Sequence, residues 1–330
     1  MHSNSHLNNQ ITHSTLLLNN KLHVIGVIQN AVRYHSRYRL FRQWVKEMLG
    51  NPNVVLHVVE ATYGDRAPEC APNADTGDYS YMQVKTDSEI WLKENLINIG
   101  VKNLFPRDWK YMAWVDCDVS FRNPDWAQAT LHQLQHYNIL QPWSDLVDLD
   151  YHGGIFGHFK SFGYLCANGK KKWHGKGKDG YTYAHTGMAW ACTRYFYENV
   201  EKLLDVCIVG AGDHHMAWGC VGNIRDTIHS GMPEEYYRHC EDWMRKAEKA
   251  CAGIVGYVHG RIEHHFHGPK DRRNYWGRWD IVTSNKLNPE TDLAYDSQGV
   301  LILCGANKYQ IEHQVMTYNR NRLEDSIEQY

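Results

Sequence analysis

The first half of the chain alternates between short apolar runs and segments whose apolar residues recur at helical spacing. Leu40, Trp44 and Met48 lie on one face of a predicted helix, which Gly50 ends. Three runs are mostly apolar, the first of them dense in β-branched residues, which predicts buried strands: LHVIGVI (22–28), NVVLHVVE (53–60) and KYMAWV (110–115). Strand–helix–strand order predicts an α/β protein built on a parallel sheet.

Capping signals predict two further helices around the third run. Thr86 and Glu89 fit a capping box at the start of a helix that Gly100 closes. Asn123 and Pro124 fit the N-cap and first position of a helix that continues to about Tyr137. The alternation predicts a doubly wound sheet, in which ligands bind beyond the carboxyl ends of the strands.

The pattern changes after residue 151. Glycine and lysine gather over 153–180, and the segment GKKKWHGKGKDG (169–180) predicts a mobile basic loop. A short strand (187–193) and a helix (194–204) should follow, and EHHFHG lies in the last third. Residues 1–20 are polar and predict a flexible arm. Since no repeat or clear linker divides the chain, we expect one large domain.

Composition narrows the class of protein. With 330 residues, 43% hydrophobic and 22% charged residues and a net charge of -2, the chain is a globular protein and not a globally basic nucleic-acid binder. The 12 Trp and 21 Tyr could stack on sugars or pack in the core. No apolar run reaches the roughly 18 residues of a membrane span. The start lacks a signal-peptide core, and nine Cys without a CxxC pair favour a reducing, cytoplasmic location.

The third predicted strand runs directly into Asp116-Cys117-Asp118. Residues two apart on an extended backbone face the same way, so the two carboxylates should lie side by side. Two ionised carboxylates at such a short distance repel each other unless a cation lies between them. Mn²⁺ or Mg²⁺ suits carboxylate and phosphate oxygens. Such a pair also fits a solvated turn, but the strand before it and the predicted helix after it favour a metal site.

Two segments resemble glycosyltransferases of the GT-A type, in the galactosyltransferase-like and N-acetylgalactosaminyltransferase-like branch. They are EIWLKENLINIGVKNLFPRDWKYMAWVDCDVSFRNPDW (89–126) and HTGMAWACTRYFYENVEKLLDVCIVGAGDHHMAW (185–218). The resemblance implies a Rossmann-like mixed sheet and a hexosyltransferase that uses a nucleotide diphosphate sugar. It also implies a nucleotide-sugar-binding half (21–150), an acceptor-binding and catalytic half (151–285) and a C-terminal extension (286–330).

The resemblance implies a role for one acidic residue and one histidine in particular. Asp213, in GAGDHHMAW, matches the acid beside the acceptor hydroxyl and is the candidate base of an inverting transfer. It could equally cap a helix that starts at His214. A histidine often joins the two aspartates on the metal. We expect His267, then His265; the other candidates in the stretch are His259 and His264.

Further residues are expected around the donor. Arg272 and Arg273 could neutralise the diphosphate. Trp190 could stack on a sugar or pack in the core. Residues that follow the first strand are expected near the base and ribose: Gln29, Asn30 and Arg33.

Several readings stay open. The acceptor could be a saccharide or another hydroxyl compound. It could also be a hydroxymethylated base in DNA, as for bacteriophage enzymes, with phosphates held by the Lys-rich loop 170–178. A non-catalytic sugar-binding protein on a GT-A-like scaffold is a third reading. A nucleotidyltransferase would need a glycine-rich loop after the first strand, where Gln29-Asn30-Ala31 stands. The donor sugar, the nucleotide, the stereochemistry and the oligomeric state are not fixed by the sequence.

Overall fold

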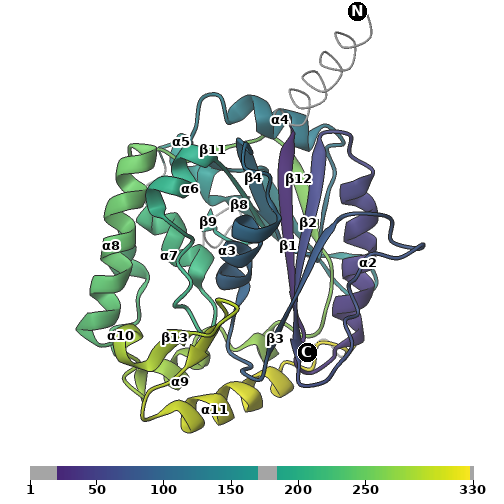
Figure 1. Ribbon diagram of the computed structural model, residues 1–330. Helices are drawn as coiled ribbons and strands as arrows, with labels where there is room; N and C mark the ends of the chain where they lie inside the picture. The colour runs from purple at the N-terminus through teal and green to yellow at the C-terminus, as the bar shows by residue number, and fades with distance from the viewer. Residues whose placement is uncertain (1–20, 170–183, 328–330) are drawn as a thin grey trace, which may run out of the picture.

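A mixed sheet of seven strands runs through the computed structural model, which describes residues 21–169 and 184–327 (Figure 1). Its strands are β1 (Leu22–Gln29), β2 (Val54–Tyr63), β3 (Ser80–Thr86), β4 (Tyr111–Val115), β6 (Ile139–Gln141), β10 (Ala189–Thr193) and β11 (Gly256–Tyr257). The spatial order is β11-β6-β10-β4-β1-β2-β3. β1 to β4 pair with one another in parallel, whereas β10 is antiparallel to both β4 and β6.

Helices cover both faces of this sheet. They are α2 (His35–Leu49), α3 (Lys93–Leu104), α4 (Trp126–Gln133), α5 (Phe162–Ala167), α6 (Arg194–Val200), α7 (Gly212–Gly219), α8 (Glu234–Cys251), α9 (Asp280–Thr283), α10 (Pro289–Asp292) and α11 (Lys308–Asn321). On one face Trp44 of α2 belongs to the same buried cluster as Val24. On the other, Leu96 of α3 shares a cluster with Ile25. The predicted class, a mixed sheet flanked by helices, is confirmed.

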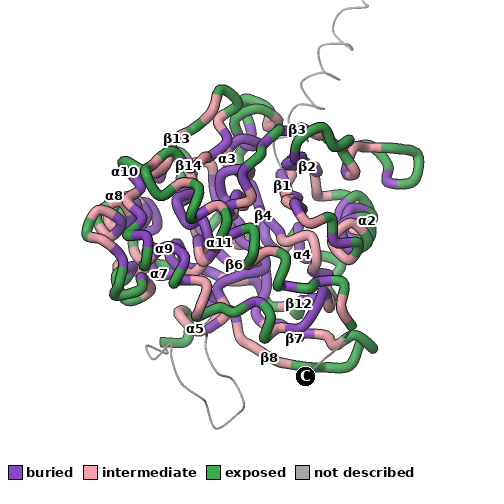
Figure 2. Tube along the Cα trace, turned by 90° about the horizontal axis from the view of Figure 1, so that it is seen from below, coloured by how far each residue is buried: buried purple, intermediate pink, exposed green. Residues whose placement is uncertain are grey.

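A second sheet of five strands stands beside the first and was not predicted from the sequence. It has the order β5-β12-β7-β8-β9. The bounds are β5 (Val119–Phe121), β7 (Asp145–Leu149), β8 (Ile155–Ser161), β9 (Ala184–His185) and β12 (Arg261–His264); β13 (Leu293–Tyr295) and β14 (Leu301–Leu303) form a separate hairpin. Val115, Leu146 and Ile262 lie in one buried cluster, so the two sheets share a core and form a single domain (Figure 2).

The three predicted strands are present with nearly the expected bounds, but the capping box is wrong. Thr86 ends β3, its hydroxyl accepts a hydrogen bond from the Ser88 amide at 3.1 Å, and α3 begins only at Lys93. Between them, the side-chain amide of Gln29 donates to the Ile90 carbonyl and accepts from the Leu92 amide. This contact, made by a residue distant in sequence, holds the segment out of the helix.

Two helix boundaries also differ from expectation. Asn123 is not the N-cap of α4; its side chain accepts from the Asp125 amide at 3.0 Å in an Asx turn, and the helix starts at Trp126 and ends at Gln133. The helix after β10 ends at Val200 rather than near residue 204. Short polar side chains offer alternative local hydrogen bonds, which is why such boundaries shift by a few residues.

Two predicted segments lie outside the described residues: the arm 1–20 and most of the basic loop 169–180, including its lysines at 170–178. In the described part of the chain, every helix is too short or too polar to traverse a membrane. The nine cysteines are free thiols.

Candidate functional site

The end of β4 is where the two sheets meet. Asp118 is followed at once by β5, whose Val119 pairs with His264 of β12 in antiparallel register. The backbone amide of His265 donates to the Asp118 carbonyl at 2.9 Å. The register of the second sheet therefore brings the histidine-rich stretch beside the predicted acidic segment.

Asp118, His264 and His267 converge on one point. Oδ2 of Asp118 lies 3.0 Å from Nε2 of His267 and 3.8 Å from Nε2 of His264. The two Nε2 atoms are 3.2 Å apart, and one ligand atom from each residue lies within 4.8 Å of the others. Both imidazoles are buried. The second oxygen of Asp118 is buried too and has no hydrogen-bond partner in the described structure.

The hydrogen bonds around this triad suit a cation. Nδ1 of His264 lies 2.7 Å from Oδ1 of the buried Asp148, which also pairs with Lys270. A carboxylate only accepts, so Nδ1 carries the proton of His264 and Nε2 turns a lone pair towards Asp118. Arg273 donates to Nε2 of His267 at 2.9 Å, so that nitrogen is an acceptor as well. Two imidazole lone pairs and a carboxylate oxygen thus face one another, which a divalent ion would stabilise.

The two aspartates that follow β4 have opposite electrostatic environments. Burial alone would raise the pKa of Asp118, but the neighbouring imidazoles and the Arg273 guanidinium hold it well below the usual range. Burial raises the pKa of Asp116 to about 6, against the opposing effect of Lys93. Burial also lowers the pKa of His264, so its ring is neutral near pH 7. Asp118 and His264 are therefore in the protonation states that a metal ligand needs.

Asp116 lies beside the triad and makes different contacts. Its carboxylate forms an ion pair with Lys93 at the start of α3. Its backbone amide donates to the carbonyl of Met188 at 2.7 Å. Met188 has a φ of 79°, which costs a non-glycine residue on the order of 1 kcal/mol or more. The backbone is thus held in an unfavourable conformation where it supports Asp116.

Asp213 enters the same region from α7. The structure corrects its expected capping role: α7 begins at Gly212, after Ala211 in a left-handed conformation with φ 76°, and Asp213 lies in the first turn. A Cβ on Gly187 would lie 2.8 Å from Oδ2 of Asp213, so only glycine permits this approach. Lys93 interacts electrostatically with both Asp213 and Asp116, so the two acids lie near the same cation.

Glu94 adds another acid to this group, one that the sequence did not mark. Its carboxylate is buried and would lie 2.6 Å from a Cβ on Gly212. Burial raises the pKa of Glu94 to about 7, with Lys93 opposing. Its position two residues into α3 resembles an ordinary first-turn acid, so no sequence signal distinguished it.

The residues expected around the nucleotide are mostly engaged with the protein itself. Gln29 holds the backbone on both sides of Trp91, and Asn30 makes two hydrogen bonds of 2.9 Å with the Tyr34 backbone. Arg33 pairs with Glu69 at 2.9 Å on the surface. A pocket does open in front of β1 and β4. Its lining includes one aromatic ring and three cations that the sequence did not mark: Trp91, Lys93, Arg37 and Arg322.

Of the remaining predicted residues, one contacts the triad and the others lie outside it. Arg273 is buried against His267, whereas the adjacent Arg272 is exposed. His265 contacts Ser120 at 2.7 Å and His259 contacts Tyr257 at 3.3 Å, both outside the triad. Trp190 is 3% exposed, stacks on Trp114 and donates to the Thr186 carbonyl at 2.6 Å. It lies in the core, and a sugar contact for it stays a prediction.

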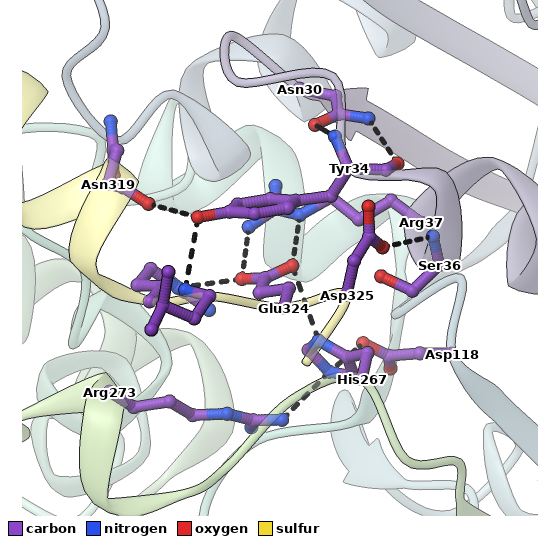
Figure 3. A network of polar contacts seen from close by, with 12 residues as sticks. Asn30, Tyr34, Ser36, Arg37, Asp118, His267, Arg273, Asn319, Glu324 and Asp325 are labelled. Carbon is purple, nitrogen blue, oxygen red and sulfur yellow. Dashed lines mark hydrogen bonds and ion pairs between the residues drawn. The ribbon is translucent and has the colours of Figure 1, made fainter. Parts of the chain in front are cut away.

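A carboxylate from the C-terminal segment completes the surroundings of His267 (Figure 3). Glu324 accepts from Nε of Arg37 at 2.6 Å and from Nη2 at 2.7 Å. Nε of Arg322 lies 2.7 Å from the same carboxylate. Oε2 of Glu324 faces Nδ1 of His267 at 3.4 Å. Residues 286–330 were expected to be a C-terminal extension, and no sequence signal indicated this contact.

No protein-family model and no curated protein matches the sequence. Solved structures similar in fold include the catalytic domain of a Drosophila β1,4-galactosyltransferase 7 in complex with xylobiose (14% identity, TM-score 0.36, covering 88% of this chain and 98% of that one). Another is a mannosyltransferase from Pyrobaculum calidifontis in complex with GDP-Man and Mn²⁺ (11%, 0.36, 93% and 88%). A third is 4-diphosphocytidyl-2C-methyl-D-erythritol synthase from Anaerococcus prevotii (10%, 0.34, 73% and 90%). These likenesses are too weak to carry an argument about the reaction, which rests on the residues of the site.

Proposed function

We propose that the protein is a metal-dependent glycosyltransferase that moves a sugar from a nucleotide diphosphate sugar to an acceptor hydroxyl, with inversion. The observation that carries the proposal is the convergence of Asp118, His264 and His267 at the carboxyl end of β4. It is supported by the buried oxygen of Asp118 that has no partner and by the hydrogen bonds that leave both Nε2 atoms as acceptors.

Asp118, His264 and His267 are the residues that would hold the ion, with Asp116 as a further ligand from the same turn. Nitrogen ligands favour Mn²⁺ over Mg²⁺, which prefers an oxygen shell. Bound there, the ion would neutralise charge that develops on the diphosphate leaving group.

The chain offers cations and one aromatic ring for the rest of the donor. Arg273 and Lys93 border the triad, and Arg37 and Arg322 line the pocket together with Trp91. Guanidinium groups suit phosphate oxygens because they donate in a planar fork. Arg33, which is exposed, would bind a part of the donor outside the pocket, whereas the exposed Arg272 and the buried Asn30 are not part of this proposed site. The pocket encloses about 130 Å³, so a nucleotide sugar would extend beyond it.

Asp213 is our candidate for the base. It would take the proton of the acceptor hydroxyl as that oxygen bonds to the anomeric carbon and the bond to the diphosphate breaks. Its electrostatic interaction with Lys93, which also pairs with Asp116, supports a position near the metal site. The acceptor that we propose is a saccharide or another hydroxyl compound. The DNA reading depends on lysines at 170–178, which lie outside the described residues.

The test is release of nucleoside diphosphate from a panel of nucleotide sugars, with Mn²⁺ or with EDTA. We expect Mn²⁺-dependent turnover that Asp118→Ala abolishes. Asp125→Ala, an exposed acid before α4, is the matched control and should keep full activity. Binding of nucleotide sugars without any turnover would instead support a non-catalytic sugar-binding protein. If neither Mn²⁺ nor any nucleotide sugar binds, the proposal is wrong.

A further inference from the structure

We propose that Glu324 is a positioning residue of the metal centre, and that it orients His267 from the C-terminal segment. The inference rests on the proposed metal site of Asp118, His264 and His267. It assigns a role to a part of the chain that neither the sequence motifs nor the proposed reaction uses.

The geometry of Glu324 is unusual for a structural acid. Its side chain is 1% exposed, and its carboxylate lies between Arg37 and Arg322 (Figure 3). Burying a carboxylate and two guanidinium groups costs several kcal/mol per ion, and their attraction often does no more than offset this. Stability alone is therefore a weak reason for this arrangement. The Oε2 atom also faces Nδ1 of His267 at 3.4 Å, and that nitrogen has no hydrogen-bond partner in the described structure.

The same arrangement occurs at the other histidine of the triad. Nδ1 of His264 faces Asp148, a carboxylate whose side chain is 1% exposed and which pairs with Lys270. Each imidazole thus has a buried carboxylate on its Nδ1 side, and each carboxylate is held by a cation. At His264 the distance is 2.7 Å, a formed hydrogen bond; at His267 it is 3.4 Å, close enough for an electrostatic contact but without a hydrogen bond in the described structure.

The chemical consequence concerns the proton of His267. A carboxylate beside Nδ1 favours the form in which Nδ1 carries the hydrogen, which leaves the Nε2 lone pair directed at Asp118. The hydrogen-bond donor at Nε2, Arg273, is consistent with this form. Without the negative charge at residue 324, no carboxylate faces Nδ1 of His267, and the ring is oriented less firmly as a ligand.

The C-terminal segment is held in place independently of this contact. The two oxygens of Asp325 accept from the backbone amides of His35 and Ser36, each at 2.8 Å, at the start of α2. Asp325 therefore anchors the segment, whereas Glu324 is the acid that reaches His267. Adjacent residues with the same charge and different contacts provide a matched pair of variants.

The experiment measures Mn²⁺ affinity of the full chain by the loss of the free Mn²⁺ electron paramagnetic resonance signal, without any donor. Glu324→Gln removes the charge, and Glu324→Asp keeps the charge between the arginines but withdraws it from His267. We expect both to bind Mn²⁺ about 10- to 100-fold more weakly than the wild type, whereas Asp325→Asn stays within about twofold. The Asp variant keeps the test valid if the Gln variant does not fold.

The outcomes separate the two proposals. Wild-type Mn²⁺ affinity in both Glu324 variants would overturn the positioning role and leave the metal site intact. An equal loss of Mn²⁺ affinity in Asp325→Asn would also overturn the positioning role, because it would indicate a general effect of the C-terminal segment. A wild-type protein that does not bind Mn²⁺ would overturn the metal site and the positioning role together.

Discussion

Oδ2 of Asp118 and Nε2 of His267 lie 3.0 Å apart; Asp118 lies in the turn that joins β4 of the large sheet to β5 of the small one, and His267 follows β12 of the small sheet. The contact therefore lies at the junction between the two sheets. An ion that binds the folded state here and not the unfolded chain should stabilise the whole domain, by an amount that grows with its concentration.

The first prediction separates the histidines. His264→Ala and His267→Ala should each abolish the increase in melting temperature that Mn²⁺ causes, because each removes one ligand of the triad. His265→Ala is the matched control, since His265 contacts Ser120 instead. Differential scanning fluorimetry with Mn²⁺ and with EDTA measures the effect. A loss of the Mn²⁺ effect only in His265→Ala would move the site to that residue.

The second prediction concerns two adjacent arginines. Arg273 is buried beside His267, and a charge-assisted hydrogen bond there is worth about 1.5–3 kcal/mol. Arg273→Gln should therefore weaken nucleoside diphosphate binding by about 10- to 100-fold. Arg272→Gln, on the exposed side of the turn, should have little effect. Isothermal titration calorimetry with Mn²⁺ present compares the two. Equal affinities for both variants would remove Arg273 from the phosphate site.

The third prediction tests the base. Asp213→Asn should lower transfer by about two to four powers of ten, because the acceptor hydroxyl loses its proton acceptor, while donor affinity is unchanged. Asp226→Asn, on the exposed turn after α7, serves as the control. Single-turnover measurements separate the chemical step from binding. Full activity in Asp213→Asn would exclude this residue as the base.

The fourth prediction concerns stability in acid. His23 and His57, on the adjacent strands β1 and β2, are buried with ring nitrogens 2.9 Å apart. Burial lowers the pKa of His57 from 6.5 to about 3 and that of His23 to about 4. Between these values and 6.5 the unfolded chain binds protons that the folded protein does not, so stability is full above pH 6.5 and falls as the pH falls.

The expected loss between pH 7 and pH 5 is about 2 kcal/mol for each of the two histidines. His57→Gln can keep a hydrogen bond to His23 but no longer titrates, so it should lose about 2 kcal/mol less over the same range. Urea denaturation at the two pH values measures both free energies of unfolding. A variant as acid-sensitive as the wild type would show that His57 is not the cause.

The strands β1, β2 and β4 of the large sheet were predictable because they are mostly apolar, whereas β3, β6 and β11 were not predicted. A run such as 110–115 has few alternatives to a buried strand, and the acids that follow it are marked by their spacing. The second sheet was not predictable, because β5 and β12 are short and partly polar and form only by pairing across more than a hundred residues. For the same reason His264 could not be preferred over His265: a shift of one residue in register exchanges which of them faces Asp118.

The rest of the site depends on contacts that leave no local signal. Gln29 follows the first strand, as expected for a donor residue, yet its amide is used to hold the segment that carries Trp91. Arg37 lies on α2, and its position in the sequence would fit an exposed arginine on that helix equally well. The residues next to Glu324 in the sequence do not indicate its role, because that role arises from residues that are distant in the sequence and close in the fold.

The pairing of Arg37 with Glu324 also bears on how the protein matures. The two residues are 287 positions apart. The ribosome therefore completes β1, α2 and β4 long before it adds Glu324. The nascent chain can build most of the large sheet early. His267 gains its buried carboxylate only after translation has passed residue 324. Metal loading should therefore be a late event, which follows synthesis instead of guiding it.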